Sequence, residues 1–72
     1  MNNASERMLK HFTYSHLPEH LQSVSKPICH LAQDMARILD SSDPTAGAEV
    51  TIGLRKLLEA KDCFVRAQVI IW

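Results

Sequence analysis

The chain has 72 residues, with eight lysine and arginine residues, eight acidic residues and a formal net charge of zero when its histidines are neutral. This length allows one small domain, and small domains often need disulfides, metals or partner subunits to be stable. Zero net charge argues against a protein that coats genomic nucleic acid, because such a protein needs a clearly basic surface. It still allows a small anionic ligand, which one or two cations per subunit can hold.

Residues 1–25 show no long periodic apolar pattern and are predicted to form an N-terminal arm. One or two helical turns fit residues 5–11, and Pro18 disfavours helix at the residue before it. Phe12 and Tyr14 alternate, so they share one face of an extended arm. We expect Phe12 to pack on the rest of the chain, whereas Tyr14 either packs there or stacks on a nucleobase.

Residues 27–40 carry the clearest helical pattern. Apolar residues recur at intervals of three and four along it: Ile28, Leu31, Ala32, Met35, Ala36 and Leu39. Pro27 suits the first turn of a helix, and Ser25 suits the N-cap. Lys26 then lies at the helix N-terminus, where a lysine opposes the helix dipole unless an anion joins them. Lys26 therefore indicates a phosphate site, with a solvated surface lysine as the alternative.

Residues 44–70 are predicted to form a second, longer helix. Ser42 or Asp43 suits its N-cap and Pro44 its first turn. A broad apolar stripe follows: Leu54, Leu57, Leu58, Phe64 and Val65. Four cations are expected mainly on the solvated face: Arg55, Lys56, Lys61 and Arg66. Because a short loop joins the two helices, the predicted fold is all-α, with residues 1–72 forming a single antiparallel helical-hairpin domain.

The two predicted helices differ in length, at about 40 Å and about 20 Å for a rise of 1.5 Å per residue. The far half of the long helix would therefore lack a partner within the chain. That half carries six apolar residues: Phe64, Val65, Val69, Ile70, Ile71 and Trp72. Uncovered apolar surface usually marks a protein contact, so the sequence predicts a homo-oligomer. No apolar run reaches the roughly 20 residues needed to cross a bilayer, so no membrane partner is predicted.

Metal and catalytic motifs are weak in this sequence. His16 and His20 are four residues apart but flank Pro18, and there is no Cys-x-x-Cys or His-Glu-x-x-His, so no metal or cofactor is predicted. Cys29 and Cys63, one in each predicted helix, are expected to be reduced core residues. Paired carboxylates for acid–base chemistry are absent, so we expect no enzyme. A nucleotide hydrolase is the weaker alternative.

Three segments, residues 12–14, 28–36 and 57–67, together resemble a known family. They read Phe-Thr-Tyr, Ile-Cys-His-Leu-Ala-Gln-Asp-Met-Ala and Leu-Leu-Glu-Ala-Lys-Asp-Cys-Phe-Val-Arg-Ala. The chain resembles the small helical-hairpin phage proteins that counter CBASS immunity by sequestering its cyclic oligonucleotide signals. The resemblance spans residues 12–67, and its motifs are short and helical.

The resemblance implies a homohexamer in the host bacterial cytoplasm that binds cyclic dinucleotides such as 3′,3′-cGAMP without cleaving them. Some family members also bind cyclic trinucleotides at separate sites. Carried over, Tyr14 matches the tyrosine that stacks on a base, with Thr13 beside it in the motif. Lys26 matches the phosphate-contacting lysine, and Arg66 is a candidate for a second site. His30 departs from the family, since many relatives have arginine there. The alternative function is a helical-hairpin module that binds a host protein.

Overall fold

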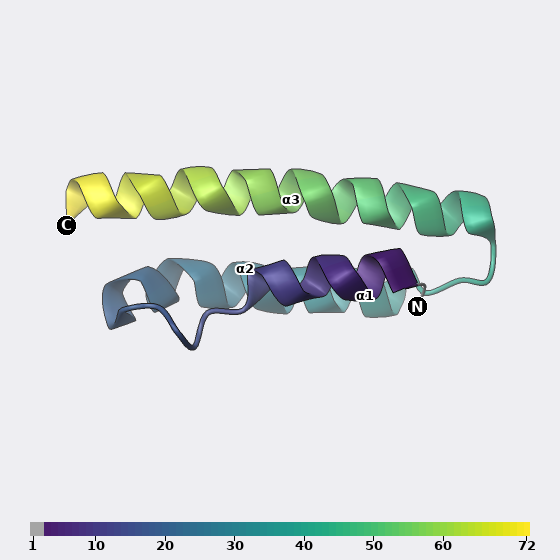
Figure 1. Ribbon diagram of the computed structural model, residues 1–72, viewed down its shortest axis with the longest axis horizontal. Helices are drawn as coiled ribbons and strands as arrows, with labels where there is room; N and C mark the ends of the chain where they lie inside the picture. The colour runs from purple at the N-terminus through teal and green to yellow at the C-terminus, as the bar shows by residue number, and fades with distance from the viewer. Residues whose placement is uncertain (1–2) are drawn as a thin grey trace.

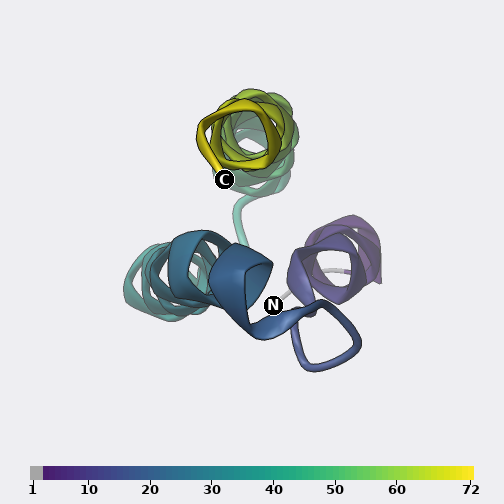
Figure 2. The same ribbon diagram turned by 90° about the vertical axis from the view of Figure 1, so that its left-hand side faces the viewer.

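The computed structural model describes residues 3–72; Met1 and Asn2 of the predicted arm lie outside the described residues. This range forms α1 (Asn3–Leu9), a 3-10 turn η1 (Lys10–Phe12), α2 (Glu19–Ile38) and α3 (Pro44–Ile71). α2 and α3 run antiparallel (Figure 1), and the view along their axes shows α1 completing a triangle with them (Figure 2). The predicted all-α class is confirmed, because residues 3–72 contain helices and no strand.

α3 agrees closely with the predicted second helix. Asp43 is the N-cap, and its side-chain Oδ1 accepts a hydrogen bond of 2.8 Å from the backbone N–H of Thr45. Pro44 occupies the first turn, where its missing N–H costs nothing. The helix continues to Ile71, one residue beyond the predicted end. Local signals at its start and apolar periodicity along its length were therefore sufficient to predict it.

The predicted start of the first long helix is wrong. α2 begins at Glu19, directly after Pro18, and ends at Ile38, so its N-terminus lies eight residues before the predicted one at Pro27. Ser25 is therefore no N-cap; it lies inside α2, fully buried, with no hydrogen-bond partner for its Oγ. Lys26 also lies in the interior of α2. The argument that Lys26 opposes a helix dipole therefore does not hold.

Tertiary contacts explain why α2 continues through Pro27. A proline inside a helix removes one backbone hydrogen bond and costs about 3 kcal/mol. The additional turns pack on the end of α3: the rings of His20 and Trp72 stack with centroids 4.3 Å apart, and Gln68 Nε2 donates a 3.3 Å hydrogen bond to the His20 carbonyl. Ser25 is buried in the same turns. Such contacts offset the cost of Pro27, and no local signal in the sequence reports them.

Small residues on α2 allow the three helices to approach closely. The buried positions of α2 are spaced four, three and four residues apart: Ser25, Cys29, Ala32 and Ala36. Phe12, from η1, is fully buried against Cys29, Ala32 and Leu54. The prediction that Phe12 packs on the hairpin is confirmed.

Two polar contacts tie the N-terminal segment to α3. Ser5 Oγ lies 3.2 Å from Thr51 Oγ1, and Lys61 Nζ donates a 2.9 Å hydrogen bond to the carbonyl of His11. Lys61 is only 8% exposed, so its contact with η1 is shielded from solvent. The predicted arm is therefore a folded third helix and turn held on α3, followed by a loop.

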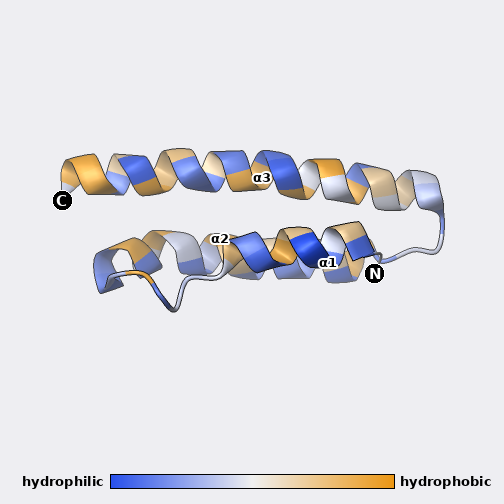
Figure 3. Cartoon of the chain, in the orientation of Figure 1, coloured by the Kyte–Doolittle hydropathy of each residue, from blue (hydrophilic) through white to orange (hydrophobic). Residues whose placement is uncertain are grey.

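The predicted overhang of the long helix needs correction. Because α2 starts at Glu19, it runs beside α3 as far as Trp72, so no half of α3 lacks a neighbour. One side of the α3 terminus is nevertheless exposed, and Figure 3 shows its apolar character. The most exposed large apolar residues there are Phe64, Val69, Ile70, Ile71 and Trp72. The apolar surface exists, but its cause is the missing cover on one side of α3, not a difference in helix length.

None of the helices in residues 3–72 combines the length and the apolar character needed to cross a membrane.

Candidate functional site

A tight turn positions Tyr14 next to α2. The backbone N–H of Leu17 donates a 3.0 Å hydrogen bond to the carbonyl of Tyr14. Gln22, in the first turns of α2, donates from Nε2 to the carbonyl of Leu17 at 2.7 Å and to that of Ser15 at 3.4 Å. These bonds fasten the loop to α2, so Tyr14 has a defined place relative to that helix.

The ring of Tyr14 lies edge-on to the ring of His30, with centroids 6.2 Å apart and planes at 80°. Edge-on rings attract each other because the positive edge of one meets the negative face of the other. Tyr14 is half-buried and also packs against the core cluster around Phe12. Its aromatic ring is therefore held in place on one side and accessible to solvent on another.

Lys26 lies one helical turn before His30, on the same side of α2, because residues four apart in a helix are neighbours. Lys26 and His30 are both exposed, as is Thr13, which precedes Tyr14 in extended conformation. We call the surface of Thr13, Tyr14, Lys26 and His30 the arm surface. It combines an aromatic ring, a cationic ammonium group and hydrogen-bonding side chains.

Within residues 3–72, no ion pair compensates the charge of Lys26. Among residues 3–72, Lys26 takes part in no ion pair, whereas further along α2 Asp34 and Arg37 pair with each other at 3.5 Å. The arm surface can therefore offer an ammonium group to a phosphate.

Arg66 lies elsewhere, on α3. Its Nη2 donates a 3.2 Å hydrogen bond to Cys63 Sγ, and both residues are exposed. Arg66 borders a shallow hollow of about 310 Å³ with four other residues: Leu17, Lys61, Asp62 and Val65. The structure thus sets Tyr14 against His30, with Lys26 one helical turn from His30 along α2, and places Arg66 at a separate hollow.

Lys61 is a residue whose place the sequence analysis missed. We expected it on the solvated face of the second helix, but it is buried and bonded to the His11 carbonyl. The signal was present, because Lys61 follows Leu54 by seven residues and Leu58 by three, which places it on the core side of α3. Lys61 also borders the hollow at Arg66, where two cations and one carboxylate meet.

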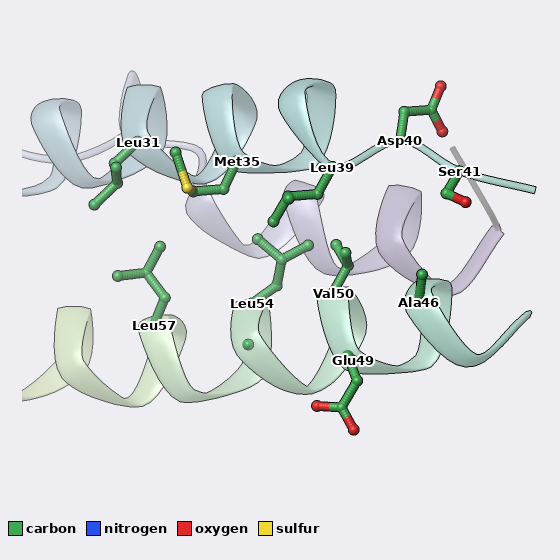
Figure 4. A pocket seen from close by; sticks show the side chains of 11 residues that line it. Leu31, Met35, Leu39, Asp40, Ser41, Ala46, Glu49, Val50, Leu54 and Leu57 are labelled. Carbon is green, nitrogen blue, oxygen red and sulfur yellow. The ribbon is translucent and has the colours of Figure 1, made fainter. Parts of the chain in front are cut away.

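An open groove runs between α2 and α3 near their connecting loop. It has a volume of about 680 Å³ and a predominantly apolar lining (Figure 4). The close-up shows Leu31, Met35 and Leu39 of α2 facing Val50, Leu54 and Leu57 of α3. Leu31, Met35 and Leu39 are 37–52% exposed, so a substantial part of each side chain is uncovered. A groove of this kind suits an apolar partner better than a charged nucleotide.

The described residues contain no group of three or more histidine, cysteine, aspartate or glutamate side chains that could hold a metal ion. Both cysteines are free thiols. Cys29 is a core residue as expected, whereas Cys63 is exposed, so the expectation of two core cysteines is right only for Cys29.

Comparisons of this chain with models of protein families, with curated proteins and with solved structures gave no match.

Proposed function

We propose that this protein binds and sequesters cyclic oligonucleotide immune signals without cleaving them, and thereby blocks CBASS antiphage defence in the host bacterial cytoplasm. The principal ligands are cyclic dinucleotides such as 3′,3′-cGAMP, with cyclic trinucleotides at a second site. The proposal includes a homohexamer. Its starting point is the resemblance of residues 12–14, 28–36 and 57–67 to the phage proteins that act in this way.

The observation that carries the proposal is the arm surface. A nucleobase stacked on an aromatic ring gains about 1–3 kcal/mol, and Tyr14 offers a ring that its contact with His30 holds in one orientation. A cyclic dinucleotide also has two phosphates, and Lys26 offers an unpaired ammonium group on the same side of α2. Sequestration needs no catalytic group, so these binding features are sufficient for it.

Two further features support the wider proposal. The hollow at Arg66 has a volume of about 310 Å³, and its border holds Lys61, Arg66 and the carboxylate of Asp62. The excess of one positive charge there fits a second anionic ligand. The exposed apolar residues at the end of α3 and in the α2–α3 groove fit an assembly in which ligand sites lie between subunits.

A direct uptake experiment tests the function. Purified protein is incubated with 3′,3′-cGAMP, separated from free ligand, and denatured by heat, and the released nucleotide is identified by chromatography. Recovery of intact cyclic dinucleotide is the expected result. Recovery of linear product would instead identify a hydrolase, and absence of uptake would contradict ligand binding.

The second candidate function is a helical-hairpin module that binds another protein. The α2–α3 groove favours it, because its lining is apolar and open to solvent. Absence of nucleotide uptake together with an intact helical fold by circular dichroism would favour this candidate over the sponge.

A further inference from the structure

One side of α3 carries a continuous seam of apolar residues at alternating intervals of four and three. The seam consists of Ala46, Val50, Gly53, Leu57, Ala60, Phe64, Ala67 and Ile71. A repeat of this kind, averaging 3.5 residues, is the pattern by which one helix contacts another along its length. The first four seam residues line the α2–α3 groove, whereas α3 turns Leu54 and Lys61 toward the core. Within residues 3–72, the open side of the seam has no covering helix.

Within residues 3–72, no contact requires a glycine at position 53. A Cβ built at this position meets no atom within 4 Å, and the residue lies in the middle of a helix, where glycine is less favourable than alanine. A missing side chain on an exposed seam lets a second helix approach closely at that point. Gly53 therefore points to a contact outside the chain's own fold.

Opposite charges flank the seam on one side. Glu49 precedes Val50 and Lys56 precedes Leu57, and both charged residues are exposed. They are seven residues apart, so they project from the same side of α3. When two such helices pair antiparallel, these flanking positions of one helix face the same positions of the other. A copy of this helix would therefore bring Glu49 opposite Lys56.

We propose that a second copy of this chain docks on the α2–α3 groove, with its α3 antiparallel to the first α3 about a two-fold axis. With the axis between Thr51 and Ile52, Val50 of one copy lies opposite Gly53 of the other, and Leu57 lies opposite Ala46. Val50 and Leu57 thus each meet a small residue, which is the condition for close packing. The seam residues from Ala60 to Ile71 lie beyond the start of the other copy's α3. The two-fold symmetry forms each of these contacts twice.

The same register aligns the charges. Glu49 of one copy lies within one helical turn of Lys56 of the other copy, and the symmetry repeats this pair. Apolar packing is satisfied in any antiparallel register that sets the large seam residues against the small ones, and the charges select this register among them. This self-complementary charge pattern points to a second copy as the occupant, since an unrelated helix would have to supply both complementary charges itself. Leu31, Met35 and Leu39 of each α2 then cover the other copy's α3, as in a four-helix bundle.

This contact specifies one interface of the homo-oligomer in the proposed function, but it requires no ligand. A hexamer with two-fold axes contains such isologous contacts. The experiment is therefore done without nucleotide. A negative result for self-association would leave the proposed ligand binding to be tested by the uptake experiment. A negative result for ligand uptake would not contradict the proposed interface.

Sedimentation equilibrium of the full chain tests the contact by charge reversal. E49K and K56E each turn both intersubunit pairs from attraction into repulsion, so each variant is expected to self-associate about tenfold more weakly than the parent. D62K is the matched control, because Asp62 is exposed on the far side of α3 from the seam. D62K should assemble like the parent.

Mixing the two charge-reversal variants gives the decisive result. In a mixed dimer, the lysine introduced by E49K faces the glutamate introduced by K56E, and the two unchanged residues, Lys56 and Glu49, face each other. Both pairs are then attractive, so association should return to the parental level.

As a second probe, G53L is expected to stay helical, since its Cβ meets nothing in the chain, yet to associate more weakly because it overfills the layer with Val50. A monomeric parent, unchanged association of both single charge variants, or no recovery in the mixture would each overturn the proposal.

Discussion

Tyr14 is the residue on which the proposed ligand site depends most. Replacing it with alanine removes the ring on which a base would stack, so Tyr14→Ala should weaken binding of 3′,3′-cGAMP by about 1–3 kcal/mol, tenfold or more. Isothermal titration calorimetry measures the change. Tyr14→Phe is the matched control, because it keeps the aromatic ring and its edge-on contact with His30, and it should bind nearly as tightly as the parent.

Tyr14 also packs against the core, so its substitution needs a check on folding. The circular dichroism spectrum and the oligomeric mass of the alanine variant should match those of the parent. If the variant is folded and assembled and still binds like the parent, Tyr14 is not in the ligand site. The ligand would then have to bind on α3, around Arg66.

Lys26 provides the second test at the scale of a single residue. Lys26→Ala removes an exposed, unpaired ammonium group and should weaken binding by about 1.5–3 kcal/mol through a lost charge-assisted phosphate contact. Lys26→Arg is not expected to restore full affinity, because a planar guanidinium does not replace a compact point charge. Calorimetry over a range of salt concentrations should show a weaker salt dependence for the alanine variant.

Arg55→Ala serves as the matched control for Lys26→Ala. It removes the same charge from an exposed position on α3, which borders neither the arm surface nor the hollow at Arg66. Equal losses of affinity in the Lys26 and Arg55 variants would indicate a general electrostatic effect and would contradict a direct contact at Lys26.

At the scale of the elements, α3 was predictable and the start of α2 was not. Asp43 and Pro44 form a local start signal, and the cap bond at Thr45 shows that it operates as expected. Pro27 resembles such a start signal, but α2 continues on both sides of it because His20 and Ser25 contact the rest of the fold. Local propensity is a weak indicator when tertiary contacts of this kind oppose it.

The residues of the arm surface were proposed from the sequence, whereas their geometry was not predictable from it. Tyr14 and Lys26 were singled out by their local patterns and by the resemblance of the chain to a family, whereas the contact of Tyr14 with His30 depends on the turn that Gln22 fastens to α2. Side-chain bonds between a loop and a helix leave no periodic pattern in a sequence. Burial of Lys61, by contrast, follows the helical period and could have been read from its spacing to Leu54.

Pro27 leads to a prediction for the stability of α2. Pro27 is exposed in the helix interior, so Pro27→Ala should restore a backbone hydrogen bond without removing core packing. The free energy of unfolding should rise, by up to about 3 kcal/mol. Denaturation in urea, followed by circular dichroism, measures it. Pro44→Ala is the control and should not stabilise the protein, because proline suits the first turn of a helix. A decrease in stability for Pro27→Ala would contradict a continuous α2.

At the scale of the whole molecule, the chain is elongated and incompletely covered. Its principal extents are 43 × 18 × 16 Å, and its radius of gyration is 13.0 Å, compared with about 11 Å for a compact domain of this length. Within the described residues, α1, α2 and α3 leave one side of the α2–α3 pair open, where a fourth helix would complete a bundle. The α2–α3 groove and the exposed end of α3 are consequences of this one missing layer.

A substitution at Phe64 tests whether a partner subunit covers the exposed C-terminal half of α3. Phe64 is 57% exposed in the single chain, so a charge at this position should cost the isolated chain little. Buried at an interface without a partner, the same charge costs several kcal/mol. Phe64→Asp should therefore stay helical by circular dichroism and lose mass in light scattering. Ala48→Asp, at an exposed position of α3 outside the seam, should keep the parental mass. If the Phe64→Asp variant still assembles, the C-terminal half of α3 lies outside the interfaces between subunits. If the variant unfolds, Phe64 supports the fold of the single chain.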